Sequence, residues 1–359
     1  RRPPRSTPLY SSAASDVYKR QPMLPVSLSN EACSLKPNQP RLTVSAIMDF
    51  DSKANFIAGT LHPSIIKSHR RFTYNEVHRL LEEDGDDPFM PTLVDMHQLS
   101  QLLRKKRFQH GSVDFQVPDS EIHMDSAGHV KRISISEHNS AHELIEEFML
   151  AANQFVALNL HERSIPSIHR IHEAPDPARL TGFNEFVDSF KLRLPSPARS
   201  TDLQTLVQQV KGRPEERVVN TLLLRTMKKA RYSETDPGHF CLGFPHYAHF
   251  TSPIRRYPDL ILHRLIKKYI KRKCPQKEKK TLLSKLAEVS EQSTHMEIKA
   301  MSIEREVTDL RRAQFMADKI GKTCLLYTSP SPRDQRGWRV AGWAWKKKGG
   351  GGGGGGGGG

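Results

Sequence analysis

The sequence predicts an α+β fold with a mixed or antiparallel sheet and flanking helices. Apolar and polar residues alternate over residues 41–50, which is the two-residue period of a strand with one buried face. Beyond residue 140, apolar residues recur at the three- to four-residue spacing of helices. Because the strands come early and the helices follow, the order favours α+β over a doubly wound parallel sheet.

The first predicted elements are a β-hairpin and two helices. Residues 51–55 (Asp-Ser-Lys-Ala-Asn) have the composition of a turn, and they lead into a second strand over residues 56–66. The sequence Thr73-Tyr-Asn-Glu76 is a capping box, which predicts a helix through about Glu83. A second helix is expected over about residues 91–108.

The rest of the chain is predicted to be mainly helical, after short strands within residues 111–136. A second capping box, Ser140-Ala-His-Glu143, is expected to start a helix that runs to about Leu160. Residues 238–250 are aromatic and have a strand-like pattern. Further helices are predicted at residues 178–190, 202–211, 214–232, 258–271 and 277–320.

Charge and composition exclude several classes of protein. The formal charge is +16, but residues 1–21 carry five basic and one acidic residue, and residues 322–359 carry seven and one, so the charge alone does not indicate nucleic acid. No apolar run approaches the ~18–20 residues of a membrane span, and the first residues lack the apolar core of a signal peptide. The four cysteines form no Cys-x-x-Cys pair, which favours free thiols in a reducing compartment. We therefore expect a soluble, cytoplasmic protein.

Both ends of the sequence differ from the rest. Residues 11–20 and 325–336 resemble translated sequencing-adapter read-through, and the last eleven residues are all glycine. A native flexible basic tail is the alternative interpretation. We expect residues 1–21 and 324–359 to be non-native, and residues 22–323 to carry the fold.

Residues 249–263 have the strongest chemical character: His-Phe-Thr-Ser-Pro-Ile-Arg-Arg-Tyr-Pro-Asp-Leu-Ile-Leu-His. Two hydroxyls, two arginines and a tyrosine lie on a loop that Pro253 and Pro258 restrain, directly before a helix start. Helix N-termini and guanidinium groups both bind phosphate. One interpretation is therefore an anion pocket, most simply for phosphate. The other is that Arg255 or Arg256 pairs with an acid of the fold.

Residues 249–263 resemble the signature of the ribonuclease II / ribonuclease R family of 3′→5′ exoribonucleases, and of its bacterial ribonuclease R members in particular. Several ordered motifs over about 300 residues are more specific than one short motif. The resemblance identifies about residues 22–323 as a partial RNB-type nuclease domain. The other matching segments, in the expected order, are residues 22–25, 28–35, 72–77, 143–153, 222–230 and 238–243.

The resemblance implies hydrolysis of single-stranded RNA from its 3′ end, with release of nucleoside 5′-monophosphates. Two divalent cations, usually Mg²⁺, would activate water and stabilise the leaving oxygen. It further implies two catalytic residues. Arg255 would grip the scissile phosphate, and Glu146 would face the 3′-terminal ribose or the neighbourhood of the metal.

The resemblance also implies a set of RNA-binding residues. Tyr74 and Phe115 would contact the terminal nucleotides, the latter by stacking, which tolerates any base. Ser252, Arg256 and Tyr257 would complete the set. Without the resemblance, Tyr74 is the exposed first residue of a helix, Phe115 is a core residue, and Glu146 is a solvated helix residue.

The metal ligands of the family are four aspartates, upstream of the segment that residues 22–25 resemble. Ahead of residue 22 this sequence has one aspartate, Asp16. Asp49 and Asp51, or the acidic run at residues 82–87, are the available substitutes, but neither matches a family acid and the run lacks calcium-loop spacing. We expect no metal site for the reaction in this chain, and an inactive fragment of an exoribonuclease.

Two other function classes are considered. A non-catalytic RNA-binding member of the family would use basic clusters at residues 105–107, 228–231 and 264–273, each of which is alternatively a solvated helix face. A different metalloenzyme would use the His-x-x-His pairs at residues 169–172 and 246–249, which lack the further ligands that zinc requires. The expected partner is single-stranded RNA, and the expected state is a monomer.

Overall fold

The computed structural model describes residues 24–83, 87–113, 115, 120–125, 128–135, 138–317 and 319–323. All elements named below lie within these ranges. The two ends that the sequence predicts to be non-native, residues 1–21 and 324–359, lie outside them. No helix in the described part of the chain is both long and apolar enough to cross a membrane.

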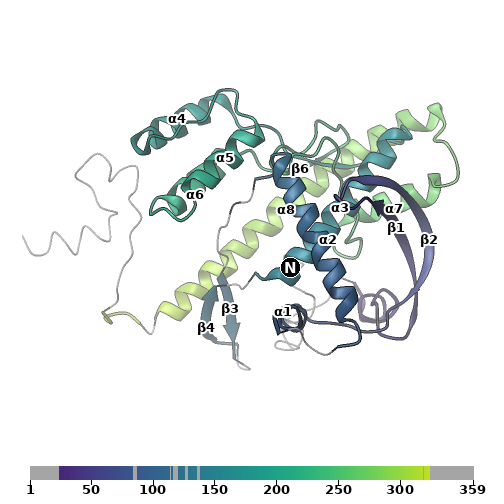
Figure 1. The fold of residues 1–359 in the computed structure, drawn as a ribbon, viewed down its shortest axis with the longest axis horizontal. Helices are drawn as coiled ribbons and strands as arrows, with labels where there is room; N and C mark the ends of the chain where they lie inside the picture. Colours follow the sequence, from purple (N-terminus) through teal and green to yellow (C-terminus); the bar gives the residue numbers. More distant parts are fainter. Residues whose placement is uncertain are drawn as a thin grey trace, which may run out of the picture.

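A long β-hairpin forms one side of the molecule (Figure 1). Strand β1 (Pro40–Phe50) pairs antiparallel with β2 (Phe56–Lys67). In the turn between them, the backbone N–H groups of Lys53 and Asn55 donate to the carboxylate of Asp51 at 2.9 and 2.7 Å. This is the geometry of an Asx turn. The predicted hairpin and its turn are therefore confirmed.

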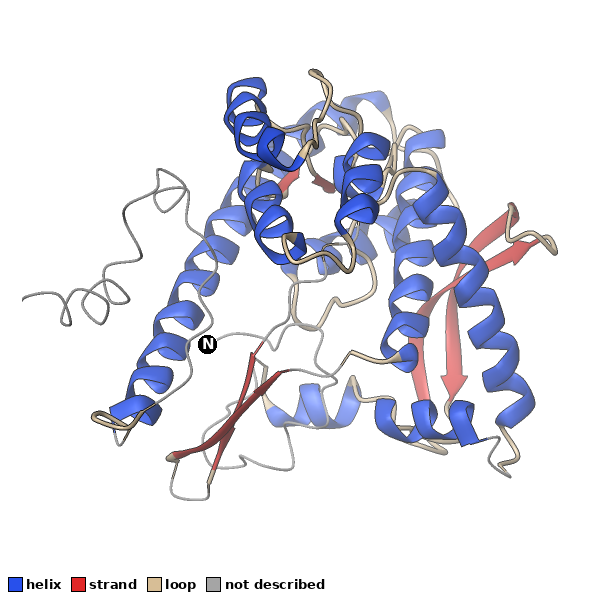
Figure 2. Cartoon of the chain, turned by 60° about the vertical axis from the view of Figure 1, so that its left-hand side comes forward, coloured by secondary structure: helices blue, strands red, loops and turns tan. Residues whose placement is uncertain are grey.

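Two further strand pairs are antiparallel and shorter. Strand β3 (Ser120–Met124) pairs with β4 (Val130–Ile135), and β5 (His169–Ile171) pairs with β6 (Arg231–Ser233). Figure 2 shows the strand pairs lying apart among the helices. The α+β class with antiparallel strands is confirmed. In the described residues the strands make three two-stranded sheets, and β5 and β6 are too short for a periodicity that a sequence reveals.

Helix α1 (Tyr74–Glu83) begins with the predicted capping box. The N–H of Thr73 donates to the carboxylate of Glu76, and the N–H of Glu76 donates to the hydroxyl of Thr73, both at 3.2 Å. These two bonds satisfy donors that a helix start leaves without intrahelical partners.

Helix α3 (Ser140–Glu162) begins where the sequence predicts, but with a different cap. Asn139 has the extended backbone of an N-cap and forms the box with His142. Ser140 is already helical, and its hydroxyl lies 2.9 Å from Nδ1 of His78. The prediction of Ser140 as the cap is therefore wrong by one residue, because asparagine is an equally good cap and precedes it.

The remaining longer helices agree with the predicted ones in order, whereas no helix is predicted from the sequence at residues 27–32 or 240–242. The short helical turns are η1 (Ser27–Ala32), η2 (Asp188–Phe190) and η3 (Phe240–Leu242). The longer ones are α2 (Met90–Gln109), α4 (Pro177–Val187), α5 (Ser200–Val210), α6 (Glu216–Thr226), α7 (Tyr257–Tyr269) and α8 (Gln276–Ala317).

Two predictions in this part are wrong. The helix expected over residues 214–232 ends at Thr226, because Met227 adopts an extended backbone and the chain then enters β6. The strand expected over residues 238–250 is absent from the structure, which has η3 and isolated bridges there. Gly238 and Gly243 have φ angles of 88° and 67° and bend the chain instead of extending it.

The helices enclose two main cores. In Figure 1, α8 runs obliquely behind the other elements, and α4, α5 and α6 form a separate group. One core joins α3, α7 and α8, where Leu160, Leu262 and Leu286 are almost fully buried. The other lies among α4, α5 and α6. Burying one leucine side chain contributes about 1.5–3 kcal/mol, so these helices hold the segments between them in fixed positions.

We expect Gly243→Ala to destabilise the protein more than Gly212→Ala. Both glycines have positive φ, at 67° and 77°, but a Cβ at Gly243 would lie 2.6 Å from the backbone oxygen of His110, whereas nothing lies within 4 Å of a Cβ at Gly212. Backbone strain alone costs about 1 kcal/mol or more, and the clash adds to it only at Gly243. Urea unfolding measures both variants. Equal losses would contradict the close approach of residues 110 and 243.

Candidate functional site

A buried carboxylate organises the loop at residues 249–263. Ser252 closes a turn, because its carbonyl accepts the N–H groups of Arg255 and Arg256 at 3.2 and 3.1 Å. Oδ2 of Asp259, in the first turn of α7, accepts the N–H of Ser252 at 2.8 Å and the guanidinium of Arg256 at 2.8 and 3.1 Å. Asp259 is fully buried. The loop is thereby fixed to the start of α7, where a negative charge is favourable.

The two arginines of the loop therefore differ. Arg256 forms an ion pair with Asp259, which was one of the two alternatives that the sequence left open. This pair holds Arg256 at the N-cap of α7. For Arg255, burial and the adjacent Arg256 guanidinium lower the pKa below its usual value. Tyr257, the first residue of α7, is 52% exposed. The RNA-binding roles of Ser252, Arg256 and Tyr257 stay predictions.

Helix α3 holds the loop from a second side. The buried side chain of Asn153 accepts the N–H of Phe250 at 2.8 Å and donates to the hydroxyl of Tyr247 at 3.1 Å. Nε2 of His263 in α7 lies 2.8 Å from the carbonyl of Phe250, and the two rings stack at 4.5 Å. Residues 247–250 are thus fastened to α3 and to α7 at the same time.

Arg170, Tyr232 and His249 lie together beside this loop. The guanidinium of Arg170 lies 4.7 Å from the ring centre of Tyr232, whose hydroxyl is 3.0 Å from Nδ1 of His249. Burial, with Arg256 and Arg170 nearby, lowers the pKa of His249 well below its usual value, so the imidazole is neutral. Burial likewise raises the pKa of Tyr232 to about 12. Arg170 is paired with Glu297 at 2.6 Å and Arg256 with Asp259 at 2.8 Å, so carboxylates of the fold balance the charge of both guanidinium groups.

The other predicted site residues have identifiable neighbours. Tyr74 is the first residue of α1, and its ring stacks on His142 with centres 4.0 Å apart. Oε1 of Glu146 lies 3.1 Å from Nε2 of His138. Phe115 packs against the core of α4–α6, as its core alternative proposes. Their catalytic and RNA-binding roles stay predictions.

Four residues of the site were absent from the predicted set. Asp259 lies inside the segment that the sequence singled out, and a buried partner for its arginines was the stated alternative. Asn153 follows Glu146 by seven residues on one face of α3, about 10 Å along the helix axis. Arg170 and Tyr232 lie on β5 and β6, and no local pattern connects them to residues 249–263.

The described residues do not offer a magnesium site beside this loop. Mg²⁺ prefers oxygen ligands in octahedral geometry. The Asp259 carboxylate is bound by Arg256, and Glu147 of α3 is bound by Arg107. Asp51 closes the hairpin turn, and the acidic run at residues 82–87 is only partly described. These residues therefore do not supply the ligands for Mg²⁺-assisted hydrolysis.

A different group of metal-type ligands does occur among the described residues: His161, Asp236 and His246. The His-x-x-His spacing of the sequence does not define it. One histidine of each predicted pair contacts Asp236. In the pair at residues 169–172 it is His169, and in the pair at residues 246–249 it is His246. Their partners go elsewhere: His172 stacks on His239, and His249 packs against Tyr232.

Comparison with known proteins decides the family. The RNB domain family matches residues 17–272. The chain belongs to the RNB family. It is 37% identical to Ribonuclease R 1 of Lactococcus lactis over 314 residues (84% of this chain, 38% of the relative) and 38% identical to Ribonuclease R of Aquifex aeolicus over 307 residues (84% and 43%). The chain thus spans about two-fifths of the length of these relatives.

Solved structures agree with this assignment. The apo form of Mycoplasma genitalium RNase R matches with a TM-score of 0.79 and 31% identity, over 84% of this chain and 48% of that one. Yeast Ssd1, described as a pseudonuclease, matches with a TM-score of 0.60 and 19% identity, over 77% and 35%. The resemblance and the fold class predicted from the sequence are confirmed. The domain boundaries at residues 22 and 323 stay predictions.

We expect Asn153→Ala to destabilise the RNB-family fold more than Asn159→Ala on the same helix. Truncation at Asn153 leaves the N–H of Phe250 and the hydroxyl of Tyr247 without their partner, and a buried group left without one costs about 1–3 kcal/mol. Oδ1 of Asn159 already has no hydrogen bond. Thermal and urea unfolding compare the two variants. A smaller loss at Asn153 than at Asn159 would contradict the role of this residue as the link between α3 and the loop.

Proposed function

We propose that this chain carries the RNA-gripping part of a 3′→5′ exoribonuclease, which hydrolyses single-stranded RNA to nucleoside 5′-monophosphates. The observation that supports it most is the loop at the start of α7, where Arg255 lies half-buried beside Arg256 in a setting that lowers its pKa. A phosphate next to Arg255 would reverse this effect, because an anion favours the charged guanidinium.

The ion pair of Arg256 with Asp259 supports this assignment, because it fixes the loop that also carries Arg255. Arg256 is held at 2.8 Å by Asp259, so it maintains the shape of the loop. Arg255 is the residue to which the family resemblance assigns the grip on the scissile phosphate, and it lies half-buried in this loop directly before α7. Ser252 and Tyr257 contact the same nucleotide, and Glu146 faces the 3′-terminal ribose.

The aromatic residues are assigned to the end of the RNA strand. The ring of Tyr74 stacks on His142. A base that stacks on the ring of Tyr74 would extend this aromatic stack. Phe115 stacks on a neighbouring base. Related proteins support an RNA ligand, because Mycoplasma genitalium RNase R has been solved in complex with ribose-methylated single-stranded RNA and with double-stranded RNA.

Hydrolysis in the whole protein is proposed to use Mg²⁺ held by the four aspartates that the family resemblance places upstream of residue 22. The cations would neutralise the charge that develops on the phosphoryl group. The residues described here would bind and orient the strand. We further propose that the protein acts as a monomer in the cytoplasm.

We expect Arg255→Ala to weaken the binding of a single-stranded RNA oligonucleotide by about 10- to 150-fold, because a charge-assisted phosphate contact is worth about 1.5–3 kcal/mol. The slope of log affinity against log salt should also fall by about 0.7, the value for one lost phosphate contact on a single strand. Fluorescence anisotropy with the complete 359-residue chain measures both quantities.

Arg264→Ala is the matched control, because Arg264 is exposed on α7 and its loss changes the net charge equally. Affinity within twofold of the parent chain is expected for this variant. If both variants lost affinity to the same extent, RNA would be held by general positive charge and not by the loop.

We expect the 359-residue chain to leave 5′-labelled single-stranded RNA intact in Mg²⁺. The same chain extended upstream through the Asp-rich segment of its gene should shorten the RNA from the 3′ end and stop when EDTA is added. Gel electrophoresis of both proteins with and without EDTA tests this. EDTA-sensitive degradation by the shorter chain would contradict the assignment of the metal ligands, whereas an inert extended chain would favour a non-catalytic RNA-binding member of the family.

A further inference from the structure

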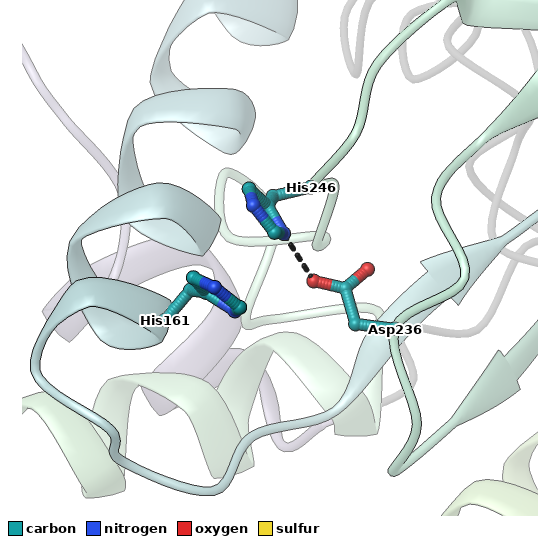
Figure 3. Close-up of side chains that lie close together, drawn as sticks. All are labelled: His161, Asp236 and His246. Atoms are coloured by element: carbon teal, nitrogen blue, oxygen red, sulfur yellow. Dashed lines mark hydrogen bonds and ion pairs between the residues drawn. The ribbon is translucent and has the colours of Figure 1, made fainter.

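Three segments that are distant in the sequence bring metal-type ligands to one point (Figure 3). His161 lies in the last turn of α3, Asp236 follows β6, and His246 lies in the segment that leads into residues 249–263. One ligand atom of each side chain lies within 4.8 Å of the other two. The group is separate from Asp259 and Arg256 and takes no part in the proposed grip on RNA.

The geometry fits a small transition-metal ion. Nδ1 of His246 lies 2.7 Å from Oδ2 of Asp236, and the rings of His161 and His246 lie 3.9 Å apart. A zinc ion bonds nitrogen and oxygen at about 2.0–2.2 Å, which places neighbouring ligand atoms about 3.3 Å apart in a tetrahedron. The two imidazole rings stack on each other, so they must turn before one nitrogen of each can point at a shared ion.

Two buried polar atoms at this point lack hydrogen bonds. Oδ1 of Asp236 and Nδ1 of His169 are both buried and have no hydrogen-bond partner in the structure. Nδ1 of His169 lies 3.3 Å from Oδ2 of Asp236, while its Nε2 lies 2.9 Å from the hydroxyl of Ser167. Buried polar atoms without partners are costly, and a nearby cation removes part of that cost at the carboxylate.

We propose that His161, Asp236 and His246 bind one divalent transition-metal ion, most simply Zn²⁺. Two imidazoles and one carboxylate suit zinc and its neighbours in the first transition row, whereas Mg²⁺ takes oxygen ligands. His169 lies beside this group, with its Nδ1 3.3 Å from Oδ2 of Asp236. His161 is exposed, so the site has an entry path from solvent.

The ion would act as a clamp. It joins the end of α3 to the chain leaving β6 and to the segment before the loop, and none of these three is joined to the others by a disulfide in the described residues. Because the ligand set forms only in the folded chain, binding the metal stabilises the fold. Three protein ligands leave a fourth position for water.

The test measures metal content and stability of the complete chain. Protein stripped with a chelator is dialysed against limiting Zn²⁺ and then against metal-free buffer, and retained zinc is measured by atomic emission. About one zinc per chain is expected, with a melting temperature several degrees above that of the stripped protein. Co²⁺ in place of Zn²⁺ should give visible absorption bands of a four-coordinate site.

The variants His161→Ala and Asp236→Asn should each lose at least tenfold in zinc affinity and lose the thermal shift. His161→Ala is the sharper of the two, because it leaves the hydrogen bond between Asp236 and His246 in place. The control is His129→Ala, which removes an exposed histidine that lies 3.6 Å from Asp125 without a third ligand. It should retain zinc like the parent chain.

The circular dichroism of stripped protein shows whether each variant is folded. No retained zinc in the parent chain would overturn the proposal, and so would full retention in both His161→Ala and Asp236→Asn. In either case the group would be a hydrogen-bonded histidine–aspartate pair. These measurements contain no RNA, so their outcome is independent of the proposed exoribonuclease function.

Discussion

The rest of the site depends on the buried pair of Asp259 and Arg256. One carboxylate oxygen accepts from the backbone of Ser252 and from the guanidinium of Arg256, within the first turn of α7. Removing one partner from a buried pair costs about 3–5 kcal/mol, because the other charge is left in a medium that does not solvate it. This constraint gives the loop one shape, and the position of Arg255 follows from that shape.

The sequence predicted the hairpin, the order of the helices and the segment that carries the site. Each of these has a local cause: alternation in β1, the box of Thr73 and Glu76, and the prolines around the loop. The failures are also local in origin. The end of the helix at Thr226 depends on the backbone angles of one residue, and so do the bends at Gly238 and Gly243. The spacing of apolar residues extends over many positions and does not reveal the conformation of one residue.

The contacts that complete the site could not be predicted, because they join residues that are far apart in the chain. Asn153 reaches the backbone of Phe250 across 97 positions, and Arg170 reaches Tyr232 through the pairing of two three-residue strands. Asn153 is buried on α3, and only the packing of α3 against the loop shows what its side chain contacts. The sequence left open that Arg255 or Arg256 pairs with an acid of the fold, and the structure identifies that acid as Asp259 for Arg256.

Two places in the fold differ in the side chains that they could offer to a metal ion. One is the loop at the start of α7, and the other is the group of His161, Asp236 and His246. Carboxylates near the loop are paired with arginine, so they are poor ligands for a cation. The group around Asp236 is different, because its ligand atoms come from two imidazoles and one carboxylate and lie within 4.8 Å of one another. A cation for hydrolysis and a cation for stability would therefore occupy separate places, since hard oxygen ligands and imidazoles select different ions.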